Sequence, residues 1–193
     1  MIAIFSSLIA SSQTLTPGQK APDFNLKNVD GKQVSFKNYP DAKGFIVVFT
    51  CNTCPYAKAY EKRIMALDKK YASLGYPVIA INPNDPEASP ADSYDKMQEL
   101  AKTKNYSFPY LFDAGQVTTD QYGAKATPHI FLIAKTDEGN IIKYTGAVDN
   151  DTEDSDPGKT KYVEQVITSL MKNETPPFTV TRAIGCTVKR KAH

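Results

Sequence analysis

The sequence predicts one α/β domain in which a mixed sheet lies between layers of helices. Apolar strand patterns alternate with helical patterns over most of the 193 residues, an order typical of α/β folds. The strand predicted at 44–50 is apolar throughout rather than alternating, as in strands that helices cover on both faces. Two later strands, at 128–134 and 140–146, flank an Asp-Glu-Gly turn and predict an antiparallel hairpin.

The other elements follow from local periodicity and turn residues. From Cys54 to Leu74, apolar residues recur every third or fourth position, which predicts a long amphipathic helix that ends at Gly75. Short alternating strands around a Val-Asp-Gly-Lys turn predict an N-terminal hairpin. The complete order is strands at 24–26, 34–36 and 44–50, the helix from Cys54, a strand at 77–81, a loop at 82–90, a helix around 94–101, a strand at 109–112, a helix at 117–122, the late hairpin and a helix at 159–172.

The composition fits one globular domain and excludes several classes of function. The chain is 41% hydrophobic and 23% charged, with a formal net charge of +2. This balance argues against a nucleic-acid partner, which would require dense runs of Lys and Arg. No run of about 18 apolar residues predicts a membrane span. Three cysteines are too few for a disulfide-scaffolded mini-protein, so we expect the fold to depend on its apolar core.

Residues 1–12 are apolar or small and contain no charged side chain. They match the hydrophobic part of a signal peptide, with cleavage near Gln13, but the positive region is missing. The start is therefore a truncated signal peptide, or instead a hydrophobic strand or a disordered tail. We expect a periplasmic or cell-envelope location, with a cytoplasmic one as the alternative. The remaining chain divides into a domain at 13–172 and a C-terminal tail at 173–193.

The candidate chemistry lies where the buried strand ends in Cys51-Asn52-Thr53-Cys54, directly before the long helix. The first turn of a helix has unpaired N–H groups and the positive end of the helix dipole, which stabilise a thiolate. A thiolate attacks disulfides, and a second cysteine three residues away can displace it from the mixed disulfide. We therefore predict that Cys51 is the nucleophile and that Cys54 is the resolving thiol.

This turn, followed some seventy residues later by Thr127-Pro128 before a hairpin, resembles the thioredoxin fold. The Ala-Pro-Asp-Phe entry at 21–24 and the Asp113…Tyr122-Gly123 pair are similar to the redoxin branch, the AhpC/TSA and TlpA/ResA relatives. The Cys-Asn-x-Cys-Pro-Tyr run is similar to a peroxiredoxin-like thioredoxin subfamily, as are 82–85 and 185–189. The resemblance covers roughly 17–190 and implies a thioredoxin-like, glutathione-peroxidase/redoxin-type three-layer sandwich with an N-terminal β-hairpin and a C-terminal tail.

The resemblance implies a thiol-disulfide oxidoreductase that uses a redox-active disulfide and needs no organic cofactor. Its partners would be thiol or disulfide proteins, including an upstream protein that resets its redox state. The resemblance also implies that Pro128 is cis and faces the two cysteines. The backbone of Thr127 would then pair with a substrate peptide while that peptide is linked to Cys51. Tyr56 beside the thiols is either an apolar contact for substrates or a half-exposed helix residue.

Two departures from the relatives affect the expected mechanism. Thioredoxins carry a buried acid in the strand before CxxC, whereas residues 45–50 contain no carboxylate; Glu61 and Asp113 are the candidates to replace it. Peroxiredoxins use Thr-x-x-Cys, but here Cys51 occupies the threonine position relative to Cys54, and no active-site arginine is matched. A thiol-dependent peroxidase is therefore an alternative rather than the leading hypothesis.

A further alternative is a redoxin-fold chaperone that binds copper or zinc, with His129 joining Cys51 and Cys54. Zinc needs more ligands than this set, and the copper chaperones use a longer cysteine spacing, so our prediction includes no metal. Cys186 in the tail is either a third redox partner of the CxxC pair or a small buried residue, which is common for free cysteines. The acidic stretch at 149–156 lacks the EF-hand spacing and predicts a solvated loop.

Overall fold

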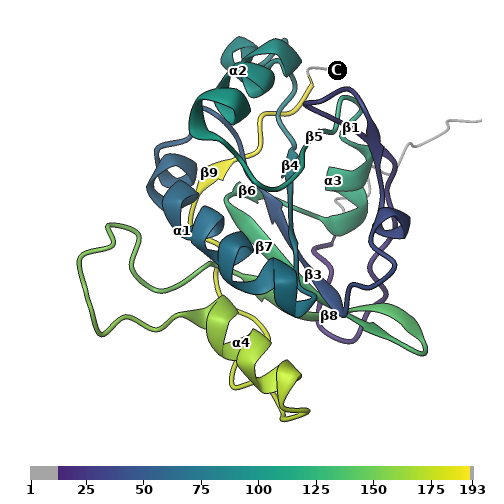
Figure 1. Cartoon of the computed structure of the whole chain (residues 1–193). Coiled ribbons are helices and arrows are strands. Elements are labelled where there is room, and N and C mark those ends of the chain that lie inside the picture. Colours follow the sequence, from purple (N-terminus) through teal and green to yellow (C-terminus); the bar gives the residue numbers. More distant parts are fainter. Residues whose placement is uncertain (1–12, 192–193) are drawn as a thin grey trace, which may run out of the picture.

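The computed structural model describes residues 13–191, so the signal peptide predicted at 1–12 lies outside the described residues. A seven-stranded mixed sheet with the order β2-β1-β5-β4-β3-β7-β8 forms the centre (Figure 1). β3 and β5 run parallel to β4, and the other neighbours are antiparallel, which confirms the mixed sheet and both predicted hairpins. Its strands are β1 (Leu26–Asn28), β2 (Gln33–Val34), β3 (Gly44–Phe49), β4 (Val78–Asn82), β5 (Tyr110–Phe112), β7 (His129–Thr136) and β8 (Gly139–Gly146).

Four α-helices within residues 13–191 cover this sheet: α1 (Pro55–Tyr71), α2 (Tyr94–Lys104), α3 (Val117–Tyr122) and α4 (Tyr162–Met171). Helix α1 begins at Pro55, whose fixed φ and missing N–H suit the first helical position. A short 3₁₀ turn, Ala72–Leu74, follows it and ends at Gly75 in the left-handed region, at φ 95°. The predicted end of the long helix is therefore confirmed.

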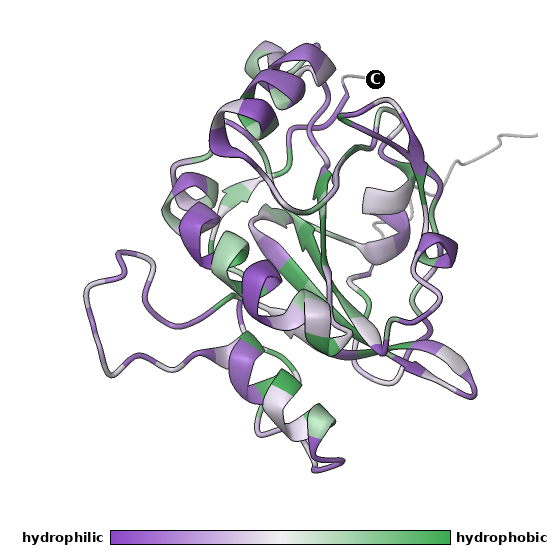
Figure 2. Ribbon diagram, in the orientation of Figure 1, coloured by the Kyte–Doolittle hydropathy of each residue, from purple (hydrophilic) through white to green (hydrophobic). Residues whose placement is uncertain are grey.

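Strand β3 separates two apolar cores because its side chains alternate between the two faces of the sheet. All six of its residues are buried. Ile46 and Val48 pack with α1, α2 and α4, whereas Phe45, Val47 and Phe49 pack with α3 and the N-terminal segment. Figure 2 shows the apolar strands between more polar helices. These are the three expected layers.

The N-terminal hairpin differs from the prediction in its boundaries. Its first strand starts at Leu26 rather than Phe24, and Phe36 lies in a 3₁₀ turn, Phe36–Asn38, rather than in a strand. Asp23 explains the difference, because its carboxylate accepts hydrogen bonds from the backbone N–H groups of both Phe24 and Phe36. Both rings then reach the core from outside the ladder, with centroids 4.7 Å apart.

The tail after α4 returns across the domain and adds a strand that sequence periodicity does not reveal. This strand, β9 (Cys186–Thr187), pairs antiparallel with β6 (Ala126–Thr127), next to the start of α1 (Figure 1). Val188 after it is buried. Across residues 13–191, no helix is both long and apolar enough to cross a membrane.

Gly44 provides a test of the close packing beneath the central strand. A Cβ there would overlap the carbonyl oxygen of Ile133 and the ring of Tyr76, whereas a Cβ at Gly115 would meet only Val117 at 3.6 Å. We expect Gly44→Ala to lower the free energy of unfolding by about 1–3 kcal/mol, because backbone atoms cannot give way cheaply. Gly115→Ala should stay within about 0.5 kcal/mol of the natural protein. Urea unfolding measures both, and equal stability of the two variants would contradict this account.

Candidate functional site

The two cysteines of the CxxC turn lie at the junction of β3 and α1. Cys51 follows the last residues of β3, and Cys54 is the N-cap residue of α1, with an extended backbone at φ −62° and ψ 126°. Both side chains are buried, at 6% and 4% exposure. Both cysteines therefore lie at the N-terminal end of α1, where the first backbone N–H groups of the helix have no partner within the helix.

Thr127 lies within hydrogen-bond distance of both sulfurs, and its peptide bond to Pro128 is cis. The Cys51 Sγ lies 3.2 Å from the Thr127 hydroxyl oxygen, and the Cys54 Sγ lies 3.1 Å from the Thr127 carbonyl oxygen. Residues Phe49 of β3 and His129 of β7 are paired in the sheet, which brings the end of one strand beside the start of the other. The structure thus brings together four of the predicted site residues.

The disulfide of the described chain joins Cys54 to Cys186 and leaves Cys51 free. The predicted dithiol pairs Cys51 with Cys54, so the structure shows a different partner for Cys54. The interpretation of Cys186 as a small buried residue is wrong, because this cysteine is half-buried and covalently linked across 132 residues of sequence. Cys51, Cys54 and Ala57 form one apolar cluster, and Cys186 packs against it.

The tail occupies the backbone edge that the resemblance assigns to a substrate peptide. Thr127 pairs with Cys186, and Ala126 pairs with Thr187. The N–H of Val188 extends the ladder by donating to the Lys125 carbonyl at 3.1 Å. The residue joined to Cys54 is therefore also the residue paired with Thr127.

A buried carboxylate that the sequence analysis missed holds the turn between the cysteines. Asp92 is fully buried and accepts hydrogen bonds from the Asn52 N–H at 2.6 Å and the Thr53 hydroxyl at 2.9 Å. It also accepts from the Asn84 amide at 2.9 Å and the Ser89 hydroxyl at 2.6 Å. The Asn- and Asp-rich loop after β4 could have indicated this residue. Because β3 and β4 are parallel, the loop after β4 lies at the same edge of the sheet as the CxxC turn after β3.

Glu61 and Asp113, the candidates for a buried acid, lie in different places. Glu61 lines a cavity of about 10 Å³ that Cys51 also lines, which is roughly the space of one water molecule. Its carboxylate accepts from Lys104 at 2.6 Å and from the Tyr106 hydroxyl at 3.0 Å. Asp113 is buried but accepts from the N–H and hydroxyl of Thr119 in α3, and it does not line this cavity.

Two tyrosines flank the thiols with different exposure. Tyr56 is 40% exposed at the start of α1 and is therefore open to contact with a partner. Tyr110 is buried and donates a hydrogen bond from its hydroxyl to the Asn52 side-chain oxygen at 2.8 Å. Burial, and next the charge of Cys51, raise the pKa of Tyr110, so this phenol stays a neutral donor.

His129 follows the cis-proline and is buried in β7. Its Nε2 lies 3.0 Å from the Thr145 hydroxyl, and its Nδ1 has no hydrogen-bond partner among the described residues. Burial, together with the positive charge of Lys125, lowers the pKa of His129 to about 4. Within residues 13–191, no group of three or more His, Cys, Asp or Glu side chains could hold a metal ion.

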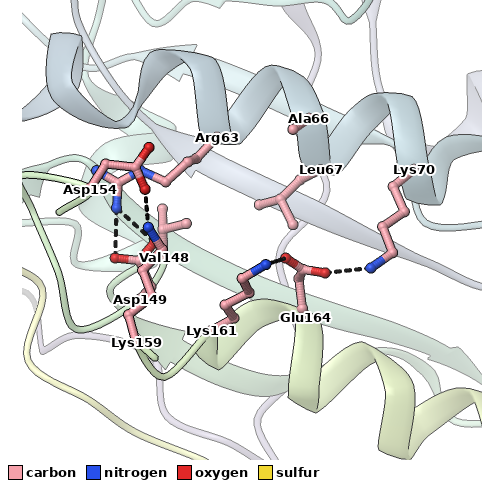
Figure 3. Close-up of a pocket in the computed structure, with 10 residues that line it drawn as sticks. All are labelled: Arg63, Ala66, Leu67, Lys70, Val148, Asp149, Asp154, Lys159, Lys161 and Glu164. Carbon is pink, nitrogen blue, oxygen red and sulfur yellow. Dashed lines mark hydrogen bonds and ion pairs between the residues drawn. The ribbon is translucent and has the colours of Figure 1, made fainter. Parts of the chain in front are cut away.

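A larger cavity of about 200 Å³ lies between α1 and α4, and no cysteine lines it (Figure 3). Arg63 donates there to both carboxylate oxygens of Asp149 at 2.7 Å, and Glu164 bridges Lys70 and Lys161. The prediction of a solvated acidic loop is wrong for Asp149, which is only 2% exposed. This charged cluster fastens the loop before α4 to the domain.

Asp92 gives a direct test of how the CxxC turn is held. Asp92→Ala leaves four donors without their charged acceptor, but only the Asn84 amide belongs to a buried residue, and the donors on Asn52, Thr53 and Ser89 can bind water instead. We therefore expect the free energy of unfolding to fall by about 2–4 kcal/mol, mainly the cost of the buried donor left without a partner. The reduced variant should also react faster with iodoacetamide at Cys51. The control is Asp95→Ala, because Asp95 is exposed on α2. Unchanged stability and thiol reactivity in the Asp92 variant would contradict this role.

His129 should make stability depend on pH. The folded chain keeps it neutral down to about pH 4, whereas an unfolded histidine takes up a proton near its ordinary pKa of 6.5. Protonation therefore favours the unfolded chain, and the contribution of His129 to stability falls as the pH drops from 6.5 towards 4. We expect His129→Gln to gain about 2 kcal/mol relative to the natural protein between pH 7 and pH 5. Urea unfolding at both values measures it, and a constant difference would refute the assignment.

Comparison with known proteins identifies the family. A profile of the AhpC/TSA family matches residues 17–144. Thiol-disulfide oxidoreductase ResA of Halalkalibacterium halodurans is 26% identical over 145 residues, which cover 75% of this chain and 77% of that protein.

Two solved structures extend the comparison. A hypothetical protein from Sinorhizobium meliloti 1021 has a TM-score of 0.85 at 28% identity, covering 94% of this chain and 98% of that one. A putative thioredoxin from Neisseria meningitidis has a TM-score of 0.61 at 21% identity, covering 81% and 92%, and shares the fold. Since the family profile matches well over half of the chain, this protein belongs to the AhpC/TSA family and has a thioredoxin-like fold.

Proposed function

We propose that the protein is a thiol-disulfide oxidoreductase that acts through Cys51 and Cys54. Cys51 attacks a disulfide of a partner, forming a mixed disulfide and releasing one partner thiolate. Cys54 then attacks the Cys51 sulfur, forms the Cys51–Cys54 disulfide and releases the second partner thiolate. An upstream thiol protein reduces this disulfide, so the reaction needs no organic cofactor.

One observation carries the proposal: a strand joined by a disulfide to the CxxC turn also pairs with Thr127. A mixed disulfide with an extended peptide needs the same backbone pairing, which holds the peptide while its sulfur reacts. In the structure the bonded sulfur is that of Cys54, and we propose that a partner peptide uses the same edge while it is linked to Cys51, whose Sγ lies 3.2 Å from the Thr127 hydroxyl oxygen. The similarity to a thiol-disulfide oxidoreductase named ResA supports the same chemistry. Tyr56, exposed beside the turn, is proposed to contact the partner.

A thiol-dependent peroxidase is a second candidate, favoured by membership of the AhpC/TSA family and by the place of Cys54 at the N-cap of α1. The arginines of the chain argue against it. Arg63 binds Asp149, Arg190 binds Asp120, and Arg182 is exposed in the tail, so none of them lines the cavity beside Cys51. Peroxide consumption with dithiothreitol tests this candidate, which requires that Cys51→Ser keep activity and Cys54→Ser lose it.

Residues 1–12, which lie outside the described structure, are relevant to the cellular location of the protein. We propose an extracytoplasmic location from the apolar leader at 1–12, since such a compartment suits thiol-disulfide exchange with exported proteins. Fractionation of cells that express the full chain tests this, and recovery in the cytosol alone would refute it.

The reduction of insulin disulfides by dithiothreitol tests the main proposal. We expect Cys51→Ser and Cys54→Ser each to lower the catalysed rate to the uncatalysed one, because attack and resolution both need a thiol. The surface variant Lys172→Gln, at the end of α4, serves as the control and should keep full activity. Full activity in either cysteine variant would overturn the dithiol mechanism.

A further inference from the structure

We propose that Cys186 is a third redox-active cysteine, which takes over the disulfide of the CxxC pair and so regenerates the Cys51 thiol. This inference rests on the proposed function and adds a step to it. The Cys186 thiolate attacks the Cys54 sulfur of the Cys51–Cys54 disulfide. The Cys54–Cys186 bond forms, the Cys51–Cys54 bond breaks, and the electron pair leaves on Cys51, which takes up the proton that Cys186 lost. The number of disulfides does not change.

The structure contains the product of this step. Cys54 is bonded to Cys186, and Cys51 is free beside them. Cys51 and Cys54 form one apolar cluster with Ala57, and Cys186 packs against it. A free thiol thus lies in the same cluster as a disulfide that includes its own CxxC partner, which is the proximity that thiol-disulfide exchange needs.

Noncovalent contacts on both sides of Cys186 also hold the tail against the domain. Before it, Gly185 approaches Thr127 so closely that a Cβ would overlap the Thr127 carbonyl oxygen. After it, Val188 is buried and donates its N–H to Lys125. The position of Cys186 therefore does not depend on the covalent bond alone.

Further along the tail, Lys189 connects to the loop that holds the CxxC turn. Its N–H donates to the Asn84 side-chain oxygen at 2.9 Å, and its carbonyl accepts from the Asp85 N–H at 2.9 Å and from Gln116 at 2.9 Å. Asn84 donates in turn to Asp92, which binds the N–H of Asn52. One hydrogen-bonded network thus aligns the tail and the turn, which lowers the entropy cost of bringing the third sulfur to the pair.

Disulfide mapping of the full chain tests the proposal. The reduced protein is oxidised with one equivalent of diamide, and excess reagent is removed. Iodoacetamide is then added, and samples taken at successive times are acidified to stop the reaction. Peptide mass spectrometry identifies the disulfides and the alkylated cysteines in each sample. We expect the Cys54–Cys186 fraction to decline while Cys51–Cys54 with alkylated Cys186 rises, because the released tail thiol is less buried than Cys51. Cys51→Ser is the matched control, since it forms Cys54–Cys186 but has no thiol to exchange, and its disulfide should persist.

The outcomes separate this proposal from the proposed function. Absence of Cys54–Cys186 in both proteins, or its persistence in the natural protein without alkylated Cys186, would overturn the role of Cys186. A Cys51–Cys54 disulfide in Cys186→Ser would leave the dithiol mechanism standing in either case, and its absence there would refute that mechanism instead.

Gly185 provides a second variant that leaves all three cysteines in place. Gly185→Ala forces the tail away from Thr127, so we expect the ratio of Cys54–Cys186 to Cys51–Cys54 to fall about tenfold. Gly115→Ala, whose Cβ meets open space except for Val117 at 3.6 Å, should leave the ratio unchanged. An unchanged ratio in Gly185→Ala would show that the docked tail does not place Cys186, which would contradict the proposal.

Discussion

The burial of β3 on both faces is the constraint on which the rest of the site depends. All residues of β3 are buried and apolar, so reactive side chains can lie only beyond its end. Cys51 lies there, next to the first turn of α1. The parallel neighbour β4 ends at the same edge and supplies the loop with Asp92. The antiparallel neighbour β7 starts at that edge and supplies the cis-proline. Three segments distant in sequence therefore converge without any one of them being long.

Polar groups at this edge of the sheet are buried, so each needs a hydrogen-bond partner. The resulting hydrogen bonds hold the CxxC turn and the loop after β4 in fixed positions. Asp92 satisfies donors from the CxxC turn and from its own loop, while Asn84 joins that loop to the tail. An unpaired donor in this position would cost about as much as a lost hydrogen bond to a charged group. The same bonds that stabilise the fold thus fix the direction in which the two sulfurs face Thr127.

Local patterns were sufficient for the fold and for half of the site. The continuous apolar run, the CxxC turn and the helix that starts behind it are neighbours in sequence, so their geometry follows from strand and helix periodicity. The pairing of Cys54 with Cys186 spans 132 residues, and the two-residue strand that seats it has no periodicity to detect. Asp92 was missed for a related reason, since the two donors that connect it to the CxxC turn, on Asn52 and Thr53, lie about 40 residues away in sequence. Hydrogen bonds between polar residues far apart in sequence depend on how the strands are ordered in the sheet, and local sequence patterns do not reveal that order.

An odd number of thiols changes what the site can do. Three cysteines close only one disulfide, so an oxidised chain always retains one thiol within the same cluster. With Cys54 common to both disulfides, that thiol is Cys51 when the tail is bonded and Cys186 when it is not. Exchange between the two disulfide states consumes no external reagent. The noncovalent contacts that hold the tail against the domain set the equilibrium between these states. The contacts between Gly185 and Thr127 therefore influence how often the attacking thiol is available, although neither residue carries a sulfur.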